Sequence, residues 1–498
     1  MKPDIPRIRL WVALGLVTLA AAAHAQNPPE LGERMRSLSE AVDRVQAQIE
    51  ASQRELDVLR RELAGLVASG VAPASAPARG AAEEHSAAVE LASAVAELRE
   101  TQAMEQAQIA TLEQSKAESD SKYPIKLSGT ILMTSFINTR RADLLPSPNV
   151  AFEGAGSTGG TMRQTTLGID ARGPHLFGAE SHANLRLDFA GSASTSGSSA
   201  GYSWGLARLR TAGAELTWRN TQAFFSLDRP ILSPESPDSL TAVAVPPLAW
   251  SGNLWTWNPQ LGASHDWLPE HRAHLRTQLA VIDVADAPGN FSAAAPGTYT
   301  PPGTAELSRW PGVEGRIALV SGNESEGLQA GVGGFFAPHR TTGGTTFDSW
   351  AGSADLRLPL SRYAALSAFA YRGQALGGMG AGAYKDYVAL VAHGAYYFRA
   401  LEDVGGWMQL KQHVGQRLEL NEAVGMDNVP ALQLRQYVLT NTPSYYSLAR
   451  NRTITGNVIY RPSAYFLFSL EYRHIASSYV NYPTASSDVI GLAAGYRF

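Results

Sequence analysis

Residues 123 to 498 alternate apolar and polar side chains with a period of two, and this pattern limits the possible folds more than any other feature. In residues 179 to 191, AESHANLRLDFAG, small or apolar residues alternate with Glu180, His182, Asn184, Arg186 and Asp188. A β-strand points successive side chains to opposite faces, so this strand has one apolar face and one charged face. Such strands are typical of a transmembrane barrel around a water-filled lumen. Alternation alone does not exclude a soluble sandwich.

The C-terminal residues SDVIGLAAGYRF favour the barrel. Ile490, Leu492, Ala494, Tyr496 and Phe498 share one face of this last strand. A terminal aromatic residue on a final amphipathic strand resembles the signal by which Gram-negative outer-membrane barrels are recognised for assembly. We therefore predict an all-β transmembrane barrel over residues 123–498, with Tyr496 and Phe498 as the signal for the barrel assembly machinery and the lipid bilayer as its surroundings.

The N-terminus predicts export. Lys2, Arg7 and Arg9 precede the apolar run LWVALGLVTLAAA, and Ala23-His24-Ala25 follows it. This is the pattern of a signal peptide over residues 1–25, cut before Gln26. The alternative is a membrane anchor, but an anchor needs roughly 18 or more apolar residues, and this apolar run is shorter. The chain has no cysteine, which excludes disulfides and thiolate metal sites.

An α-helical coiled coil is predicted between the signal peptide and the barrel. From Leu31 to Leu66, apolar residues recur at spacings of four and three, interrupted only at Ser52. This heptad pattern predicts a periplasmic coiled coil over 26–66, although one amphipathic helix on a domain is an alternative. Residues 67–80 form a flexible linker, and residues 81–122 a second, weaker helical segment.

The barrel segment divides into about 16 antiparallel strands. A barrel chain that starts and ends in the periplasm needs an even number of strands. Short connections are typical of periplasmic turns, and we find them at residues 173–175, 269–271, 322–325, 360–362, 413–416 and 461–463. The longer stretches between them are rich in glycine and proline, which is typical of outer loops. The apolar run 386–400 would break the parity, so we place it in an outer loop. The alternation slips between Arg210 and Leu216, which predicts a β-bulge.

Charged residues on the predicted inner face are the candidate site. Residues 123–498 contain 25 arginines, three lysines and 27 carboxylates. Selectivity must then come from placement, and arginine suits anion selection because its planar fork binds carboxylates bidentately. Ion pairing that only stiffens the wall is the alternative. The predicted pore-lining residues are Arg186, Asp188, Arg208, Arg210, Arg276, Glu314, Arg316, Asp355, Arg357, Glu471 and Arg473.

The long segment from Pro230 to Asn258 is predicted to narrow the pore. It contains Trp250, Trp255 and Trp257 and is long enough to fold into the lumen. Without such a loop, a sixteen-stranded barrel leaves a wide aqueous channel.

Other chemistry has little support in the sequence. There is no GxSxG, no phosphate-binding loop followed by a helix and no HExxH, and the glycine-rich run 377–382 is a loop. His182 is interpreted as a hydrated histidine of the pore wall rather than a catalytic base. We expect no catalytic residues, no metal, no cofactor and no nucleic-acid partner.

Several segments resemble one family of outer-membrane proteins. NRTITGNVIYRPSAYFLFSLEYRHI (451–475), GGWMQLKQHVGQRLELNEAVGMDN (405–428), YRGQALGG (371–378) and LRLDFAG (185–191) are similar to DcaP-like trimeric outer-membrane porins, relatives of the phosphate-selective porins. The resemblance implies a homotrimer of sixteen-stranded barrels with a coiled coil in the periplasm. It also implies passage of small anionic solutes such as dicarboxylates.

We therefore expect a passive channel for small anionic solutes in the outer membrane of a Gram-negative-type bacterium. One alternative is a structural anchor whose coiled-coil stalk tethers the barrel to the periplasm or cell wall. A third hypothesis is an outer-membrane hydrolase.

Overall fold

The computed structural model describes residues 124–191, 205–269, 271–288, 302–322, 327–439 and 441–498. All of them belong to one compact unit, Gln102–Phe498. The predicted signal peptide (1–25), coiled coil (26–66), linker (67–80) and second helical segment (81–122) lie outside the described residues and stay predictions. Among the described residues, no helix is both long enough and apolar enough to cross a membrane.

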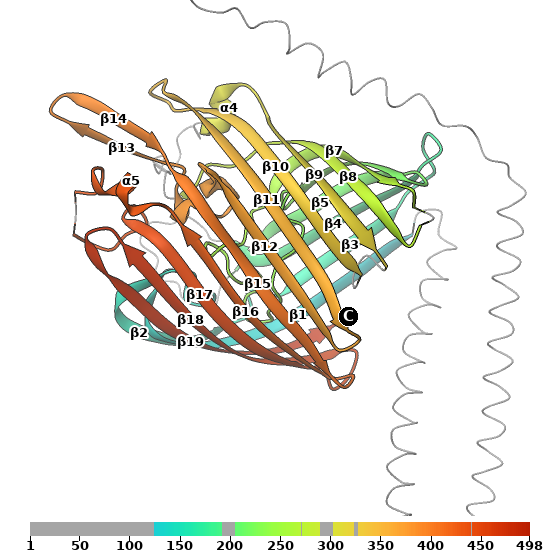
Figure 1. The fold of residues 1–498 in the computed structure, drawn as a ribbon. Coiled ribbons are helices and arrows are strands. Elements are labelled where there is room, and N and C mark those ends of the chain that lie inside the picture. Colours follow the sequence, from blue (N-terminus) through green and yellow to red (C-terminus); the bar gives the residue numbers. More distant parts are fainter. Residues whose placement is uncertain (1–123, 192–204, 270, 289–301, 323–326, 440) are drawn as a thin grey trace, which may run out of the picture. The chain divides into compact units, whose positions relative to one another are not determined.

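The strands form one closed antiparallel barrel (Figure 1). Almost every wall strand pairs with the next along the chain, and the first strand, β1 (Ile125–Ala142), pairs with the last, β19 (Tyr482–Arg497). Thr130 lies opposite Arg497, and Asn138 lies opposite Val489. Closure gives the backbone groups of both terminal strands a partner, which a strand needs if it is to cross a bilayer.

The other wall strands are β2 (Ala151–Thr161), β3 (Thr166–Arg172), β4 (Glu180–Gly191), β5 (Leu206–Thr217), β6 (Thr221–Asp228), β7 (Asn258–Trp267), β8 (Ala273–Ile282), β9 (Gly312–Ser321), β10 (Leu328–Arg340), β11 (Thr346–Ser361), β12 (Ala364–Gln374), β15 (Glu402–Val414), β16 (Leu418–Asn428), β17 (Leu448–Tyr460) and β18 (Phe466–Tyr479).

The wall has sixteen strand positions, as predicted, because β2 and β3 share one. Both pair antiparallel with β1, β3 beside its first half and β2 beside its second half. Only residues 162–165 separate them, so they form one interrupted strand. The sequence does not predict β2, because AFEGAGSTGGT is rich in glycine and lacks apolar alternation.

The two ends of the barrel differ in their connections. We call the end where β1 starts and β19 ends the turn end, and the opposite end the loop end. The predicted short connections whose residues are all described lie at the turn end: 173–175, 360–362, 413–416 and 461–463. At one of them, Gly415 has a φ of +69°, a left-handed conformation that glycine adopts without strain.

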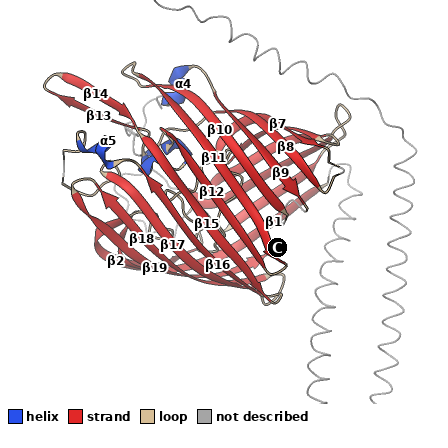
Figure 2. Ribbon diagram, viewed as in Figure 1, coloured by secondary structure: helices blue, strands red, loops and turns tan. Residues whose placement is uncertain are grey.

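Short helices and one hairpin occupy the loop end (Figure 2). The helices are α4 (Thr304–Ser308) and α5 (Ala431–Arg435), with 3-10 turns η2 (Gly377–Met379) and η3 (Gly382–Tyr384). The hairpin consists of β13 (Tyr387–Ala392) and β14 (Ala395–Ala400), which pair with each other in a separate two-stranded sheet. The prediction that residues 386–400 lie outside the barrel wall is confirmed.

The outer face of the wall is apolar. In β19, Ile490, Leu492 and Tyr496 are exposed, whereas the alternate residues Val489 and Ala493 are buried. Exposed aromatic side chains gather near the turn end at Trp267, Tyr363, Tyr460, Tyr465, Phe466, Tyr496 and Phe498. An apolar band with an aromatic girdle is the surface that a transmembrane barrel presents to lipid.

The predicted β-bulge lies at Arg210 in β5. Arg186 of β4 pairs with Thr211, but the next residue, Leu187, pairs with Leu209. Arg210 is therefore the extra residue, and the strand changes phase there. This bulge keeps Arg208 and Thr211 on the same face, although they are three residues apart.

Candidate functional site

The predicted pore-lining residues lie on the inner face of the wall. Their strand neighbours, such as Leu275, Ile317 and Leu470, are exposed on the outer face. Several of the charged side chains contact the segment between β6 and β7, which lies inside the barrel. Their part in solute passage stays a prediction.

The segment between β6 and β7, residues 229–257, folds into the lumen as predicted, and we call it the inward loop. Its first part reaches β9 and β11. The Leu232 backbone N–H donates to Glu314 Oε2 at 3.4 Å, the Ser353 hydroxyl donates to the Leu232 carbonyl at 3.0 Å, and Glu235 pairs with Arg357 at 2.9 Å. The loop thus reaches strands that are not adjacent to those from which it starts.

The middle and end of the inward loop continue around the inner wall. Asp238 pairs with Lys411 of β15 at 2.8 Å, and Ser239 donates to Glu471 of β18. The Ala244 carbonyl then accepts from Arg208 of β5 at 2.7 Å. Because the loop contacts β9, β11, β15, β18 and β5 in turn, it narrows the lumen over much of its circumference.

Ion pairs near the turn end are partly exposed. Arg186 Nη2 lies 2.6 Å from Asp170 Oδ1, with 38% and 26% of the two side chains exposed. Arg276 Nε lies 2.7 Å from Asp266 Oδ1, with 23% and 24% exposed. His182 lies between two carboxylates: its Nδ1 is 3.4 Å from Glu215 Oε1, and its Nε2 is 3.9 Å from Asp170 Oδ1. These groups form a hydrated, charged wall.

Two other predicted pairs are buried under the inward loop and other loops. Arg316 binds Asp355 through Nε at 2.9 Å and Nη2 at 2.6 Å, and only 2% and 1% of the side chains are exposed. Arg473 pairs with Glu471 at 2.6 Å and also donates to the Pro148 carbonyl. Arg316 and Arg473 therefore contact protein rather than open water in this structure. Burial of such pairs in the wall corresponds to the stiffening role that the sequence left open.

Glu314 differs from the other predicted carboxylates because its contact is to backbone. One oxygen accepts from Leu232, and the other has no hydrogen-bond partner among the described residues. Its side chain fixes the start of the inward loop.

A cluster of three arginines lies where the inward loop meets β5. Arg208 binds the fully buried Asp188 through Nε at 3.0 Å and Nη2 at 2.6 Å, whereas Arg210 Nε stays 3.7 Å from the same carboxylate. Both guanidinium carbons lie 5.1 Å from the centre of the Trp257 ring. These are cation–π distances. The tryptophan of the inward loop thus orients both arginines.

Arg229 adds a third positive charge to this cluster. Its charge acts on Arg210, and burial lowers its own pKa from the ordinary value. Nη2 donates to the Pro234 carbonyl at 2.9 Å, and Nη1 has no hydrogen-bond partner among the described residues. The carboxylates near these three arginines are Asp188, Asp228 and Glu235, and Glu235 also pairs with Arg357. Four arginines therefore share three carboxylates, which leaves one positive charge in excess.

The predicted assembly residues lie at the turn end. Tyr496 stacks on Tyr465, with ring centroids 6.1 Å apart, and contacts Phe466 edge-on. Phe498 exchanges two backbone hydrogen bonds with Gly129, at 3.0 and 3.1 Å. The hydrogen bonds of Phe498 join the end of the chain to the first strand, whereas Tyr496 contacts the start of β18. The role of the two residues as a signal stays a prediction.

Sequence reasoning missed a buried polar network at the loop end. We call residues 375–386 the mouth segment; it contains the glycine-rich run predicted as a loop. Lys385 Nζ donates to the carbonyls of Leu448 at 2.6 Å, Ala383 at 2.9 Å and Tyr445 at 3.0 Å. Burial lowers the pKa of Lys385 to about 7.

Two loop carboxylates hold the same region. Asp386 accepts backbone N–H groups from Ala287 and Gly378, both at 3.2 Å, and burial raises its pKa to about 7. Asp143 accepts from the Tyr384 hydroxyl at 2.8 Å, and burial raises its pKa as well. Each of these ionisable groups joins segments far apart in the sequence, so alternation gave no signal for the network.

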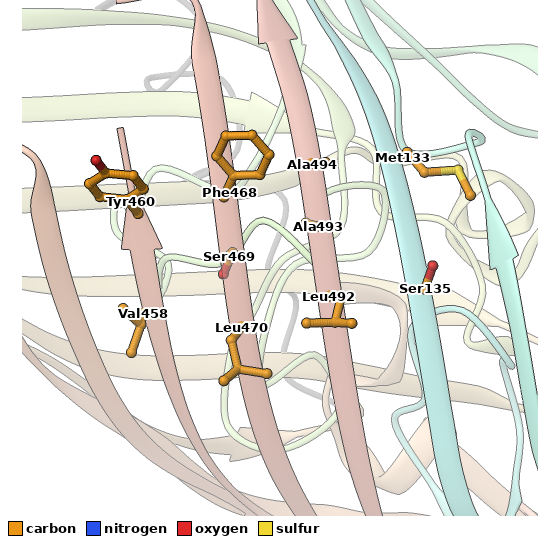
Figure 3. A pocket seen from close by; sticks show the side chains of 10 residues that line it. All are labelled: Met133, Ser135, Val458, Tyr460, Phe468, Ser469, Leu470, Leu492, Ala493 and Ala494. Atoms are coloured by element: carbon orange, nitrogen blue, oxygen red, sulfur yellow. The ribbon is translucent and has the colours of Figure 1, made fainter. Parts of the chain in front are cut away.

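The described residues contain no group of three or more His, Asp or Glu that could hold a metal ion. An apolar hollow of about 510 Å³ lies on the outer face, between Tyr460, Phe468, Leu492 and Met133 (Figure 3). Because it opens on the outside of the wall, it is not a solute site of the lumen. A polar hollow of about 180 Å³ on the wall of β4 to β7 is lined by residues that include Asn184, Glu215, Gln222, Arg229 and Gln260.

No family model matches the sequence, and no curated protein matches it. Among solved structures, the chain is similar to the outer-membrane channel DcaP of Acinetobacter baumannii, with 15% identity and a TM-score of 0.55 over 76% of this chain and 97% of that chain. It is also similar to Pseudomonas putida OprB (10% identity, TM-score 0.47, 77% and 96% covered) and to an anion-selective porin from Comamonas acidovorans (11%, 0.46, 76% and 100%). The likeness to DcaP confirms the predicted barrel fold, and the two lower scores add nothing to it.

Proposed function

We propose that this chain is a DcaP-like outer-membrane porin, a passive diffusion channel for small anionic solutes in a Gram-negative-type bacterium. The closed barrel supports a transmembrane position, because its outer face is apolar and its inner face charged. The partly exposed ion pairs near the turn end support a hydrated passage. The inward loop supports selectivity, because it brings side chains close to any solute in the lumen.

The arginine cluster at Trp257 is the observation that carries the anionic preference. Arg208 already holds Asp188 bidentately, and the guanidinium groups of Arg210 and Arg229 have no hydrogen-bonded carboxylate among the described contacts. Of these, the Arg210 side chain is 19% exposed. A guanidinium in this position binds a carboxylate solute through two parallel hydrogen bonds. Dicarboxylate-like solutes fit this chemistry.

The remaining predictions complete this proposal. The turn end faces the periplasm, where residues 26–66 form the coiled coil, and the barrels associate as a homotrimer. Tyr496 and Phe498 are read by the barrel assembly machinery. If so, deleting Phe498 lowers the yield of folded, heat-modifiable barrel more than deleting residues 26–122 does.

A structural anchor is the second candidate, and a specific observation favours it. The inward loop and the mouth segment occupy the lumen, and Arg316 and Arg473 are buried in ion pairs instead of facing water. Such a wall is stiff, which suits a barrel that anchors a periplasmic stalk.

Single-channel recording of purified protein in planar bilayers separates the two candidates. A porin gives discrete conductance steps, and a salt gradient gives a zero-current potential of the sign expected for anions. An anchor inserts as a folded barrel without conductance steps. Heat-modifiable migration on gels provides the control for folding.

A further inference from the structure

The mouth segment lies inside the loop end of the barrel with protein on every side. The fully buried side chains in it are Leu376, Met379, Ala381, Ala383 and Lys385. The Met379 carbonyl accepts from the backbone N–H of Trp255 in the inward loop at 3.0 Å. The segment therefore fills space between the inward loop and the wall.

Side chains of the wall hold the mouth segment, rather than strand pairing. Asp403 of β15 accepts the backbone N–H of Gly382 at 2.8 Å, and Asp427 of β16 accepts that of Ala383 at 2.7 Å. Residues 375–386 belong to none of the wall strands. These contacts can therefore break without opening any ladder of the barrel.

Aromatic rings from three loops meet at the mouth segment. Tyr384 stacks between Trp250 of the inward loop, at a centroid distance of 3.9 Å, and Tyr445 of the loop before β17, at 4.4 Å.

The packed position of the segment carries strain and buried charge. Ala375, Ala383 and Tyr384 have φ values of 53°, 47° and 74°, in the left-handed region that residues with a Cβ avoid. Lys385 is a buried amine whose acceptors are backbone carbonyls. Moving the segment into water relieves both, which offsets the loss of its contacts.

The loop that contains the mouth segment has a narrow base. The backbone N–H of Ala375 donates to the Leu401 carbonyl at 2.8 Å, so the two ends of residues 375–401 meet beside the wall. The hairpin β13–β14 lies in this loop and projects from the loop end (Figure 1). Segment and hairpin together can swing about this base while the wall stays intact.

We propose that the mouth segment is a movable plug, which closes the loop end of the lumen in this structure and leaves it when solutes pass. The plug rests on the proposed channel function. It assigns the opening step to residues 375–386 and makes the inward loop the fixed constriction beneath it.

A single engineered cysteine tests the movement, because the natural chain has none. Met379→Cys places a small thiol at a fully buried position of the plug. A membrane-impermeant, negatively charged maleimide is added to the protein in bilayers under an applied voltage. We expect labelling within the time of channel activity, followed by a lasting rise in conductance because the bulky label keeps the plug out.

Two matched variants serve as controls for the labelling. Val391→Cys on the hairpin, 71% exposed in the wild type, reacts at once. Leu132→Cys in the wall strand β1, 1% exposed, stays unlabelled while the barrel is folded. Labelling of Met379→Cys at the slow rate of Leu132→Cys in a conducting channel overturns the plug.

Replacing residues 376–386 by two glycines gives a second, independent measurement. We expect conductance to rise at least about twofold, because a sixteen-stranded barrel is wide without inner obstruction. Equal conductance of this variant and the wild type, both heat-modifiable, also overturns the plug. If neither conducts, the proposed channel function fails instead, and if only the variant conducts, the plug is supported as a closed gate.

Discussion

The open and the loop-covered parts of the barrel interior use the same residue types in opposite ways. Near the turn end, Arg186 pairs with Asp170 and Arg276 pairs with Asp266. Each of these four side chains is exposed over about a quarter of its surface or more. Deeper in the barrel, Arg316–Asp355 and the contacts of Lys385 are almost completely buried. The difference comes from the loops, which fold back over one part of the wall and leave the other hydrated. Charge on an inner face therefore indicates a pore wall only where no loop covers it.

The largest expected difference between the two regions is in stability. Arg316→Met leaves Asp355 buried without its counter-charge, which costs roughly 3 to 5 kcal/mol. Arg276→Met leaves Asp266 in contact with water, and the loss is about 1 kcal/mol or less. Denaturant unfolding of the two variants measures this contrast. Equal destabilisation would break the distinction between a covered and a hydrated wall.

A double variant sharpens the same contrast. Replacing the buried pair by Arg316→Met with Asp355→Leu removes both charges and should recover most of the lost stability, because no uncompensated ion remains. A double variant as unstable as Arg316→Met would show that the arginine acts through its bond to Gln278 or through packing instead.

The loop end should respond to pH between 7 and 5. Burial raises the pKa of Asp386 to about 7, so the packed segment holds its proton more tightly than the hydrated segment does. The packed state therefore gains stability as pH falls below 7, by up to about 1.4 kcal/mol per pH unit. Asp143, whose pKa is also raised, acts in the same direction. Conductance at pH 5 should be lower than at pH 7.

Lys385 adds a second pH dependence of the packed state, above pH 7. Its pKa is lowered to about 7, so below pH 7 it is charged in both states and adds no further slope. Above pH 7 it loses its proton first in the packed state, which again favours packing. Other titratable groups face these two side chains. Asp286 acts on Asp386, and Asp403 and Asp427 act on Lys385.

Conductance should therefore peak near neutral pH. Asp386→Asn removes most of the fall between pH 7 and 5, and Lys385→Met removes the fall above pH 7. A profile that the two variants leave unchanged would place the titrating groups elsewhere, for example among the ion pairs of the turn end.

The smallest predicted effect concerns Trp257, between the two regions. Trp257→Leu removes the ring that two guanidinium groups contact, worth about 0.5 to 1 kcal/mol each where water has access. Denaturant unfolding should show this modest loss. Trp350→Leu, a change on the outer face, is the matched control, and an equal effect of both would mean that burial area, not the arginines, explains the result.

The sequence predicted the wall well because its signal is local. Alternation in a strand such as β19 depends only on the side chains and the two-residue period, and a bulge at Arg210 appears as a slip in that period. The strand β2 was missed because glycine and serine do not give a strand one apolar and one polar face. Residues 151–161 form a strand because they pair with β1, and their own sequence pattern does not predict this pairing.

The candidate site was predicted less completely, because loops decide it. The list of inner-wall charges could not tell Arg276, which is hydrated, from Arg316, which is covered. The same holds for Lys385, one of three lysines in the barrel region, whose partners come from residues 445 and 448. Contacts between distant loops leave no period in the sequence.

The zero-current potential in a salt gradient tests the central claim most directly, that the arginines at Trp257 select anions. Wild-type channels should give a potential of the sign for anions. Arg210→Glu should shift it toward cations while the barrel stays folded, because Arg210 has no bidentate carboxylate to lose and Asp188 keeps Arg208. Arg186→Glu, at the hydrated turn end, should shift it less. A conducting Arg210→Glu channel with unchanged selectivity would contradict the claim.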